Sequence, residues 1–274
     1  RVAALRHQPV EFFKAPAAEG VSLDGWLMRP VDFDSTRRYP VLFYVYGGPW
    51  SQTVLDAWGG ARYLWHLMLA QRGYIVASLD SRGTSAPKGH AWRKAIYGRV
   101  GVVESADQAA GARFVLQRTY VDATRVGVWG WSNGGFMTLS LLFRSPEIYG
   151  TGMAVSPVTD WRLYDNVYTE RFMGLLDGNA GGYQAASLLP LASRLKGNLL
   201  LMHGMGDDNV HFQNSEMMIN ALVAADKPFR MMAYPNRTHC ICEGNGTTRH
   251  VYGLLTEYLT EKIPAGPVGA PAAQ

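Results

Sequence analysis

Hydrophobic positions along the chain form short runs that alternate with longer amphipathic stretches. Apolar and polar residues alternate over residues 10–14 and 21–29, which predicts antiparallel strands punctuated by Gly20 and the Asp24-Gly25 pair. Beyond them, apolar runs of strand length occupy residues 41–46, 74–79, 125–129, 152–155, 198–203 and 229–234. Stretches of helical length occupy residues 62–71, 104–118, 135–143, 213–225 and 246–262. This alternation predicts an α/β fold with a mostly parallel sheet covered by helices on both faces.

Composition supports a folded domain and excludes several other classes. Hydrophobic residues make up 47% of the 274 residues and charged residues 18%, so extensive disorder is excluded. No apolar run approaches the roughly 18 residues of a membrane span. The net charge of +4 is scattered, so neither a nucleic-acid nor a membrane partner is expected. We expect one domain over residues 1–263, followed by a frayed Pro/Ala/Gly-rich tail over residues 264–274.

The chain has two cysteines, Cys240 and Cys242. A disulfide between them would be strained, because only one residue separates them. Two cysteines also cannot supply a disulfide framework or a four-ligand zinc site. No metal or cofactor is expected from this sequence.

A nucleophile motif stands between the apolar run 125–129 and the helical stretch 135–143. Gly130-Trp131-Ser132-Asn133-Gly134 reads G-x-S-x-G. In α/β-hydrolases this sequence forms a tight strand-to-helix turn that lifts the serine hydroxyl above the sheet. The motif predicts an α/β-hydrolase fold with Ser132 as nucleophile; the alternative is a glycine-rich turn with an idle serine.

A serine nucleophile needs a base and an acid, which in this fold follow in the order serine, acid, histidine. Asp207 and Asp208 follow the run 198–203, and His239 follows the run 229–234. Both loops lie at the carboxyl ends of predicted strands, where they can converge on Ser132. Spacing leaves open which aspartate serves His239 and which caps the next helix. His203, at a strand end, is expected to make a buried structural hydrogen bond.

Four motifs in this order resemble one enzyme family. They occupy residues 46–49 (Tyr-Gly-Gly-Pro), 130–136, 156–171 and 203–212. Together they resemble the catalytic domain of the dipeptidyl peptidase IV subfamily of the prolyl oligopeptidase family, over nearly the whole chain. The resemblance implies that Asp207, and not Asp208, is the acid. It also implies that the hydroxyl of Tyr46 completes an oxyanion hole.

The second oxyanion donor is expected to be the backbone N–H of Asn133, which follows the nucleophile. The resemblance further implies a pocket for the residue before the scissile bond, lined by Val158, Trp161, Tyr164, Tyr168 and Val210. The spacing of the three aromatic residues puts them on one helical face. The alternative to a substrate pocket is that this face simply packs into the hydrophobic core. Asn209 matches a residue that holds a substrate carbonyl; its alternative role is a helix cap.

The chain also departs from the family pattern. Asn133 stands where mammalian members have tyrosine, so one pocket wall is expected to be altered. Cys240 stands where glycine usually follows the catalytic histidine, so it is expected to crowd the loop or to add a redox-sensitive thiol. Nothing in the sequence resembles the β-propeller of family members. The family resemblance favours a periplasmic or secreted location and leaves a homodimer open. Two N-glycosylation sequences, Asn236-Arg237-Thr238 and Asn245-Gly246-Thr247, flank His239 and are expected to be unmodified, which favours a bacterial source.

These features predict a serine exopeptidase that releases N-terminal dipeptides after a penultimate Pro or Ala. Ser132 would attack the carbonyl, His239 would carry the proton and Asp207 would orient the imidazole. An acylaminoacyl peptidase or esterase on the same three residues is one alternative. A catalytically inactive binding scaffold is another.

Overall fold

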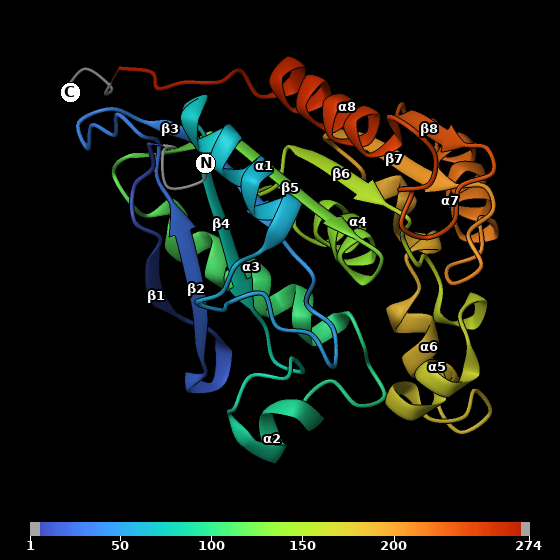
Figure 1. Cartoon of the computed structure of the whole chain (residues 1–274). Coiled ribbons are helices and arrows are strands. Elements are labelled where there is room, and N and C mark those ends of the chain that lie inside the picture. Colours follow the sequence, from blue (N-terminus) through green and yellow to red (C-terminus); the bar gives the residue numbers. More distant parts are fainter. Residues whose placement is uncertain (1–5, 270–274) are drawn as a thin grey trace.

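The computed structural model describes residues 6–269, which form one eight-stranded sheet with helices on both faces (Figure 1). The strands are β1 (Glu11–Pro16), β2 (Ser22–Met28), β3 (Tyr39–Tyr44), β4 (Ile75–Asp80), β5 (Val121–Trp131), β6 (Thr151–Val155), β7 (Asn198–Gly204) and β8 (Arg230–Tyr234). Their order across the sheet is β1-β2-β4-β3-β5-β6-β7-β8. β2 pairs antiparallel with β1 and β4, and all other pairs are parallel. The predicted α/β class and antiparallel opening are confirmed.

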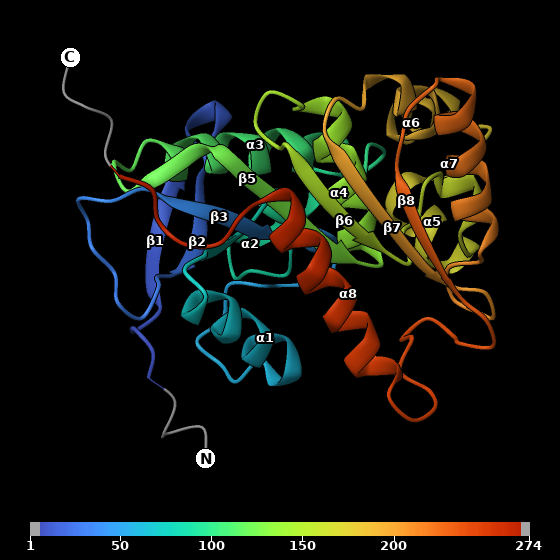
Figure 2. The ribbon, with the colours of Figure 1, turned by 90° about the horizontal axis from the view of Figure 1, so that it is seen from above.

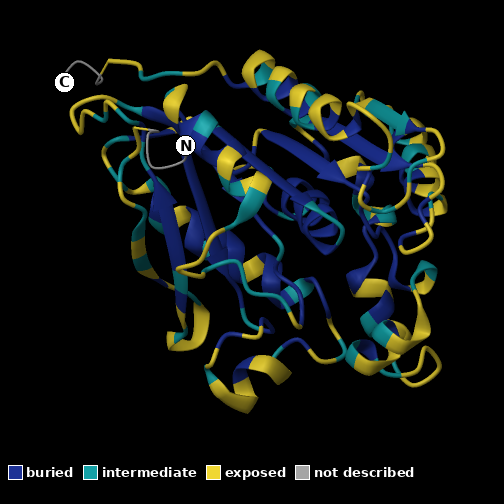
Figure 3. Ribbon diagram, viewed as in Figure 1, coloured by how far each residue is buried: buried dark blue, intermediate teal, exposed yellow. Residues whose placement is uncertain are grey.

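The helices divide between the two faces of the sheet. They are α1 (Gly60–Gln71), α2 (Gly89–Lys94), α3 (Val102–Leu116), α4 (Asn133–Arg144), α5 (Asn166–Met173), α6 (Ala180–Ala186), α7 (Gln213–Ala224) and α8 (Thr247–Lys262). Figure 2 shows α1 and α8 on one face, and α3, α4 and α7 on the other. The central strands β3, β4, β6 and β7 are almost wholly buried, whereas most residues of the edge strands β1 and β8 are not (Figure 3).

Each face of the sheet has its own apolar core. Val41 and Phe43 of β3 pack into the cluster under α3, α4 and α7. Leu42 and Tyr44 of the same strand pack into the cluster under α1 and α8. Successive strand residues point to opposite faces, so a strand buried on both sides reads as a continuous apolar run. This explains why apolar and polar residues do not alternate over residues 41–46.

One predicted turn is wrong. The Asp24-Gly25 pair lies inside β2, and the β1–β2 connection runs instead through a short 3-10 helix, Ala18–Gly20. Gly25 is required for a different reason, because a Cβ there would lie 2.5 Å from the ring of Phe13 on β1. The glycine makes room for a cross-strand aromatic side chain and does not form a turn.

The first part of the Pro/Ala/Gly-rich end is not frayed. The Arg125 guanidinium donates hydrogen bonds to the carbonyls of Pro264 and Gly266, both at 2.9 Å. Arg38 and Val268 exchange two backbone hydrogen bonds. Residues 264–268 are thus fixed to the body of the sheet, while the rest of the predicted tail, residues 270–274, lies outside the described residues. The domain boundary after residue 263 stays a prediction.

Across residues 6–269, no helix combines the length with the apolar character that a bilayer crossing demands.

Candidate active site

Ser132 stands on a strained turn between β5 and α4. Its backbone has φ 62° and ψ −121°, and its N–H donates to the carbonyl of Val155 at 2.8 Å. Such a conformation is uncommon for a residue with a Cβ and is retained only where the surroundings hold it. A Cβ at Gly130 or Gly134 would lie 2.5 or 2.3 Å from the carbonyl oxygen of Val45. The two glycines therefore let β5, α4 and the end of β3 approach closely enough to form the turn.

Asp207 lies in the loop after β7 with both carboxylate oxygens occupied. Oδ1 accepts from the backbone N–H of Asn209 and Val210, at 3.0 and 2.9 Å. Oδ2 lies 2.7 Å from Nδ1 of His239 and 3.1 Å from Nε2 of His203. Burial alone would raise the pKa of Asp207, but the hydrogen bonds from the two histidines outweigh burial and hold it well below its usual range. Asp207 is therefore a fixed, ionised carboxylate.

The structure separates the two adjacent aspartates. Asp207 is 6% exposed and contacts His239, whereas the neighbouring Asp208 is exposed. The helix expected over residues 213–225 begins at Gln213 with Phe212 as its N-cap residue, so neither aspartate caps it.

His203 is fully buried and makes the structural hydrogen bonds expected of it. Its Nδ1 lies 2.7 Å from the hydroxyl of Ser215. Its Nε2 lies 2.8 Å from the carbonyl oxygen of Val210, besides the contact with Asp207. A carbonyl can only accept, so Nε2 carries the proton and Nδ1 accepts from Ser215. His203 thus donates to the same carboxylate oxygen of Asp207 as His239.

His239 lies in the loop after β8. The indole N–H of Trp131, beside Ser132, donates to the backbone carbonyl of His239 at 2.9 Å. Ser132 and His239 line one cavity of about 550 Å³. Within the described part of the chain no hydrogen bond joins their side chains. Such contacts are often loose without substrate and tighten when it binds.

Tyr46 and Asn133 lie beside the serine. The Tyr46 side chain lines the same cavity; burial raises the pKa of Tyr46, and the neighbouring Ser132 partly offsets the rise. Asn133 begins α4, and its Nδ2 donates to the backbone carbonyl of Tyr46 at 2.7 Å. The Asn133 side chain is buried against residues 46–48 and does not line the cavity. The prediction that one pocket wall is altered by asparagine at this position stays a prediction.

The three predicted pocket aromatics meet, but not on one helical face. Trp161 belongs to a 3-10 helix (Trp161–Leu163), Tyr164 is extended and Tyr168 lies in α5. Their ring centroids are 5.4–5.9 Å apart, with Trp161 stacked on Tyr168 and Tyr164 edge-on to both. The break at Tyr164 redirects the chain, so the cluster arises from tertiary folding and not from helical spacing.

The remaining predicted pocket residues border this cluster or the core. The Tyr164 hydroxyl donates to Oδ1 of Asn209 at 2.8 Å, and both residues line the cavity. Val158 and Val210 are at most 2% exposed and belong to the core under α4 and α7.

Sequence reasoning missed several residues that line the cavity. They are Tyr44, Arg62, Trp131, Ile241 and Tyr252. Apart from Trp131, which belongs to the G-x-S-x-G sequence, they lie outside every motif, since they come from the end of β3, α1, the histidine loop and α8. Only the position of Trp131 next to Ser132 was a usable signal.

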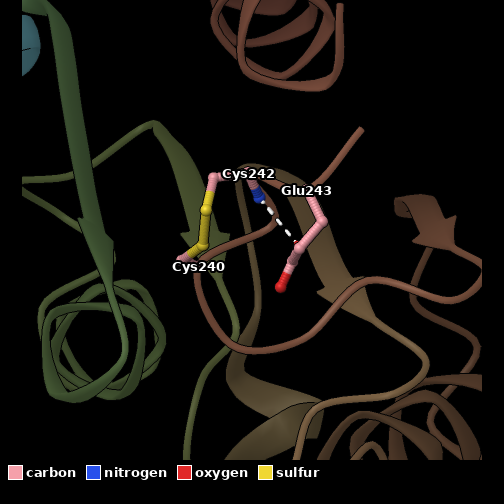
Figure 4. A group of neighbouring side chains, drawn as sticks. All are labelled: Cys240, Cys242 and Glu243. Carbon is pink, nitrogen blue, oxygen red and sulfur yellow. Dashed lines mark hydrogen bonds between the residues drawn. A yellow bond between two sulfur atoms is a disulfide. The ribbon is translucent and has the colours of Figure 1, made fainter. Parts of the chain in front are cut away.

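Cys240 and Cys242 form a disulfide across the single residue that separates them (Figure 4), so Cys240 is not the free thiol that was one of its two expected roles. With Glu243 they are also a group of potential metal ligands in the described residues. Cysteine binds metals as a thiolate, so sulfurs bonded to each other are not available as such ligands. Both cysteines line the cavity beside His239.

The fold and this arrangement together define a class. A serine on a strained strand-to-helix turn, followed in the chain by an aspartate and a histidine in contact at later strand ends, is the arrangement of α/β-hydrolases. The sequence model of the prolyl oligopeptidase family matches residues 62–265. The chain belongs to the prolyl oligopeptidase family.

Individual relatives agree with this assignment. A probable dipeptidyl-aminopeptidase B of Emericella nidulans is 42% identical over 255 residues, and that of Botryotinia fuckeliana is 39% identical over 260. These matches cover 92% and 93% of this chain but 28% of each relative, so the chain spans a little over a quarter of their length. The crystal structure of Porphyromonas gingivalis dipeptidyl peptidase 4 is 46% identical, with a TM-score of 0.91 over 96% of this chain and 37% of that one.

Proposed function

We propose that this chain is the catalytic domain of a serine dipeptidyl peptidase that cleaves after a penultimate Pro or Ala. The observation that carries the proposal is the contact of Asp207 with His239, which lines the same cavity as Ser132. Membership of the prolyl oligopeptidase family and the names of the relatives support a peptidase reaction.

The reaction follows from the roles that we assign to these groups. His239 takes the proton of Ser132 as the serine oxygen bonds to the substrate carbonyl carbon. The carbonyl oxygen becomes negative and is stabilised by the Tyr46 hydroxyl and the backbone N–H of Asn133. His239 then gives its proton to the leaving amine, and the peptide bond breaks to leave an acyl-enzyme. Water repeats the sequence and releases the dipeptide acid.

Asp207 keeps the proton on Nδ1 of His239 and stabilises the imidazolium that forms during the reaction. His203 and the two backbone donors fix the carboxylate of Asp207 in one orientation. A pre-oriented acid costs no reorganisation at the moment of proton transfer.

The aromatic cluster is the proposed pocket for the residue before the scissile bond. Tyr164 lines the cavity and donates to Asn209, and the rings of Trp161 and Tyr168 pack against it. A proline ring is rigid, apolar and without an N–H, so it suits a pocket with few donors and acceptors. The groups that select a free amino terminus are expected in a β-propeller, since the relatives extend far beyond the region that this chain matches.

Labelling with a fluorophosphonate tests the site without depending on a propeller. We expect stoichiometric phosphonylation at Ser132, seen by intact mass and mapped by fragmentation, and none in Ser132→Ala. Asp207→Asn should slow turnover of an Ala-Pro anilide about 10³- to 10⁴-fold, as when a triad acid loses its charge. The matched control is Asp208→Asn, which alters the exposed neighbour and should stay within twofold.

Two other outcomes would each support a different function. Rapid turnover of simple acyl esters or acylated amino-acid amides, with none of Ala-Pro anilide, would indicate an esterase or acylaminoacyl peptidase. A well-folded protein that never labels would indicate a binding scaffold.

A further inference from the structure

The Cys240–Cys242 disulfide immediately follows His239 and forms part of the cavity wall (Figure 4). Both cysteines are exposed, so a small thiol can reach either sulfur. They are also the only two cysteines in the sequence. Any effect of a thiol on this chain must therefore act at this pair.

The residue enclosed by the disulfide has an unfavourable backbone conformation. Ile241 has φ 41°, in the left-handed region, although its side chain is β-branched. Its side chain is 1% exposed and packs into the core cluster under α1 and α8. A backbone conformation of this kind persists only where several neighbouring interactions hold it in place.

Several restraints close this turn around His239. The Ile241 N–H donates to the carbonyl of Thr238 at 3.2 Å. The Glu243 carboxylate accepts from the N–H of Cys242 at 3.1 Å and from both the N–H and the hydroxyl of Thr238. The disulfide is the covalent member of this set, and it joins the residue after His239 to the far side of Ile241.

We propose that the Cys240–Cys242 disulfide is a site of reversible thiol–disulfide modification that sets the position of His239. The oxidised form holds Ile241 in its strained conformation and His239 against Asp207. Reduction lets residues 240–242 relax, so His239 loses its alignment with Ser132. This inference rests on the proposed role of His239 as the base.

The reaction partner is a dithiol. Its thiolate attacks one cysteine sulfur, the Cys240–Cys242 bond breaks, and the other cysteine leaves as a thiolate. The second thiol of the reductant then attacks the mixed disulfide, which frees the first cysteine and leaves the reductant as a cyclic disulfide. Two electrons pass to the protein, and both cysteines end as thiols once protonated.

The test compares fluorophosphonate labelling of Ser132 in oxidised and reduced protein. Native protein is treated with dithiothreitol, and alkylation of a sample should add two iodoacetamide groups. We expect the labelling rate to fall at least tenfold on reduction and to recover on reoxidation with oxidised glutathione. The double variant Cys240→Ala/Cys242→Ala should label slowly, and dithiothreitol should not change its labelling rate. Circular dichroism verifies that each form is folded.

A reduced protein that labels within twofold of the oxidised rate would overturn the inference, as would a disulfide that resists dithiothreitol in the native state. Hydrogen exchange at the Ile241 and Cys242 amides gives a readout that does not depend on activity, and it should rise on reduction. If the oxidised protein fails to label, the proposed function fails instead, and unchanged exchange on reduction would then reject the redox site as well.

Discussion

Single residues set the geometry of the serine turn. Gly134 illustrates this, because its place in the turn leaves 2.3 Å between a hypothetical Cβ and the Val45 carbonyl oxygen. The Val45 carbonyl belongs to the backbone, so it cannot move aside for a Cβ as the end of a flexible side chain could. The two glycines of the G-x-S-x-G sequence therefore mark the positions where three backbone segments come too close together for a side chain.

Gly134→Ala should therefore abolish fluorophosphonate labelling and lower the free energy of unfolding by about 2 kcal/mol or more, within the range of overpacking effects. Gly253→Ala is the matched control, since a Cβ there meets nothing within 4 Å and the residue lies inside α8. Alanine is the better helix former by about 1 kcal/mol, so this control should raise stability slightly. Urea denaturation of the two variants measures both effects; equal stability would contradict the steric argument.

His203 provides a second prediction at this scale. His203→Ala removes the donor to Asp207 and leaves Ser215 and the Val210 carbonyl unpaired. We expect at least a tenfold loss of kcat on Ala-Pro anilide, with KM changed less, because only the orientation of the acid is affected. The pH dependence of kcat should shift with it. His203→Gln can keep a donor towards Asp207 and should recover part of kcat; a loss confined to KM would argue against this role.

At the scale of elements, α5 holds one wall of the proposed substrate pocket. Its N-cap is Asp165, whose carboxylate accepts from the backbone N–H of Tyr168 at 2.8 Å. The same bond caps the helix and places an aromatic residue of the cluster. Helix formation and pocket geometry therefore depend on one side chain.

Asp165→Ala should lower stability by about 1 kcal/mol through loss of the cap. In a chain of this size that corresponds to a decrease in Tm of about 2–4 °C, which differential scanning calorimetry resolves. Asp165→Asn retains a side-chain acceptor and should remain close to the wild type. If both variants melted alike, the cap would not be the cause.

The sequence allowed the strands to be predicted more fully than the connections between them. Strand positions followed from apolar runs, and the candidates Ser132 and His239 followed from a motif and a chain order. The preference for Asp207 over Asp208 came only from the family resemblance. The break in the chain at Tyr164 could not be predicted, because local spacing is equally compatible with a continuous helix over Trp161–Tyr168. Nor could spacing distinguish Asp207 from Asp208, since the choice depends on which carboxylate faces a loop 32 residues further along the chain.

At the scale of the whole molecule, one buried acid couples stability to pH. Glu104 in α3 is fully buried; one carboxylate oxygen accepts from the N–H of Gly101 at 2.8 Å and the other has no partner. Burial raises the pKa of Glu104 to about 8. Glu104 is therefore largely neutral at pH 7 in the folded protein and ionised in the unfolded chain.

Stability should fall as pH rises from about 4.5, where the unfolded carboxyl ionises, to about 8, where the folded one does. The slope within this window approaches about 1.4 kcal/mol per pH unit for a single group. Glu104→Gln should remove this contribution, so urea midpoints at pH 5 and 8 should differ less than in the wild type. Glu216→Gln, at an exposed position of α7, is the control and should leave the difference unchanged.

The sheet ends at β8, and this position has a consequence for heat resistance. His239 follows β8 and Asp207 follows its neighbour β7, whereas Ser132 follows β5 in the interior of the sheet. Edge elements open at a lower free-energy cost than central ones. The loops that hold His239 and Asp207 can therefore open while the rest of the sheet remains folded. If these two residues serve Ser132 as proposed, warming should reversibly abolish labelling of Ser132 at a temperature below the unfolding of the central strands.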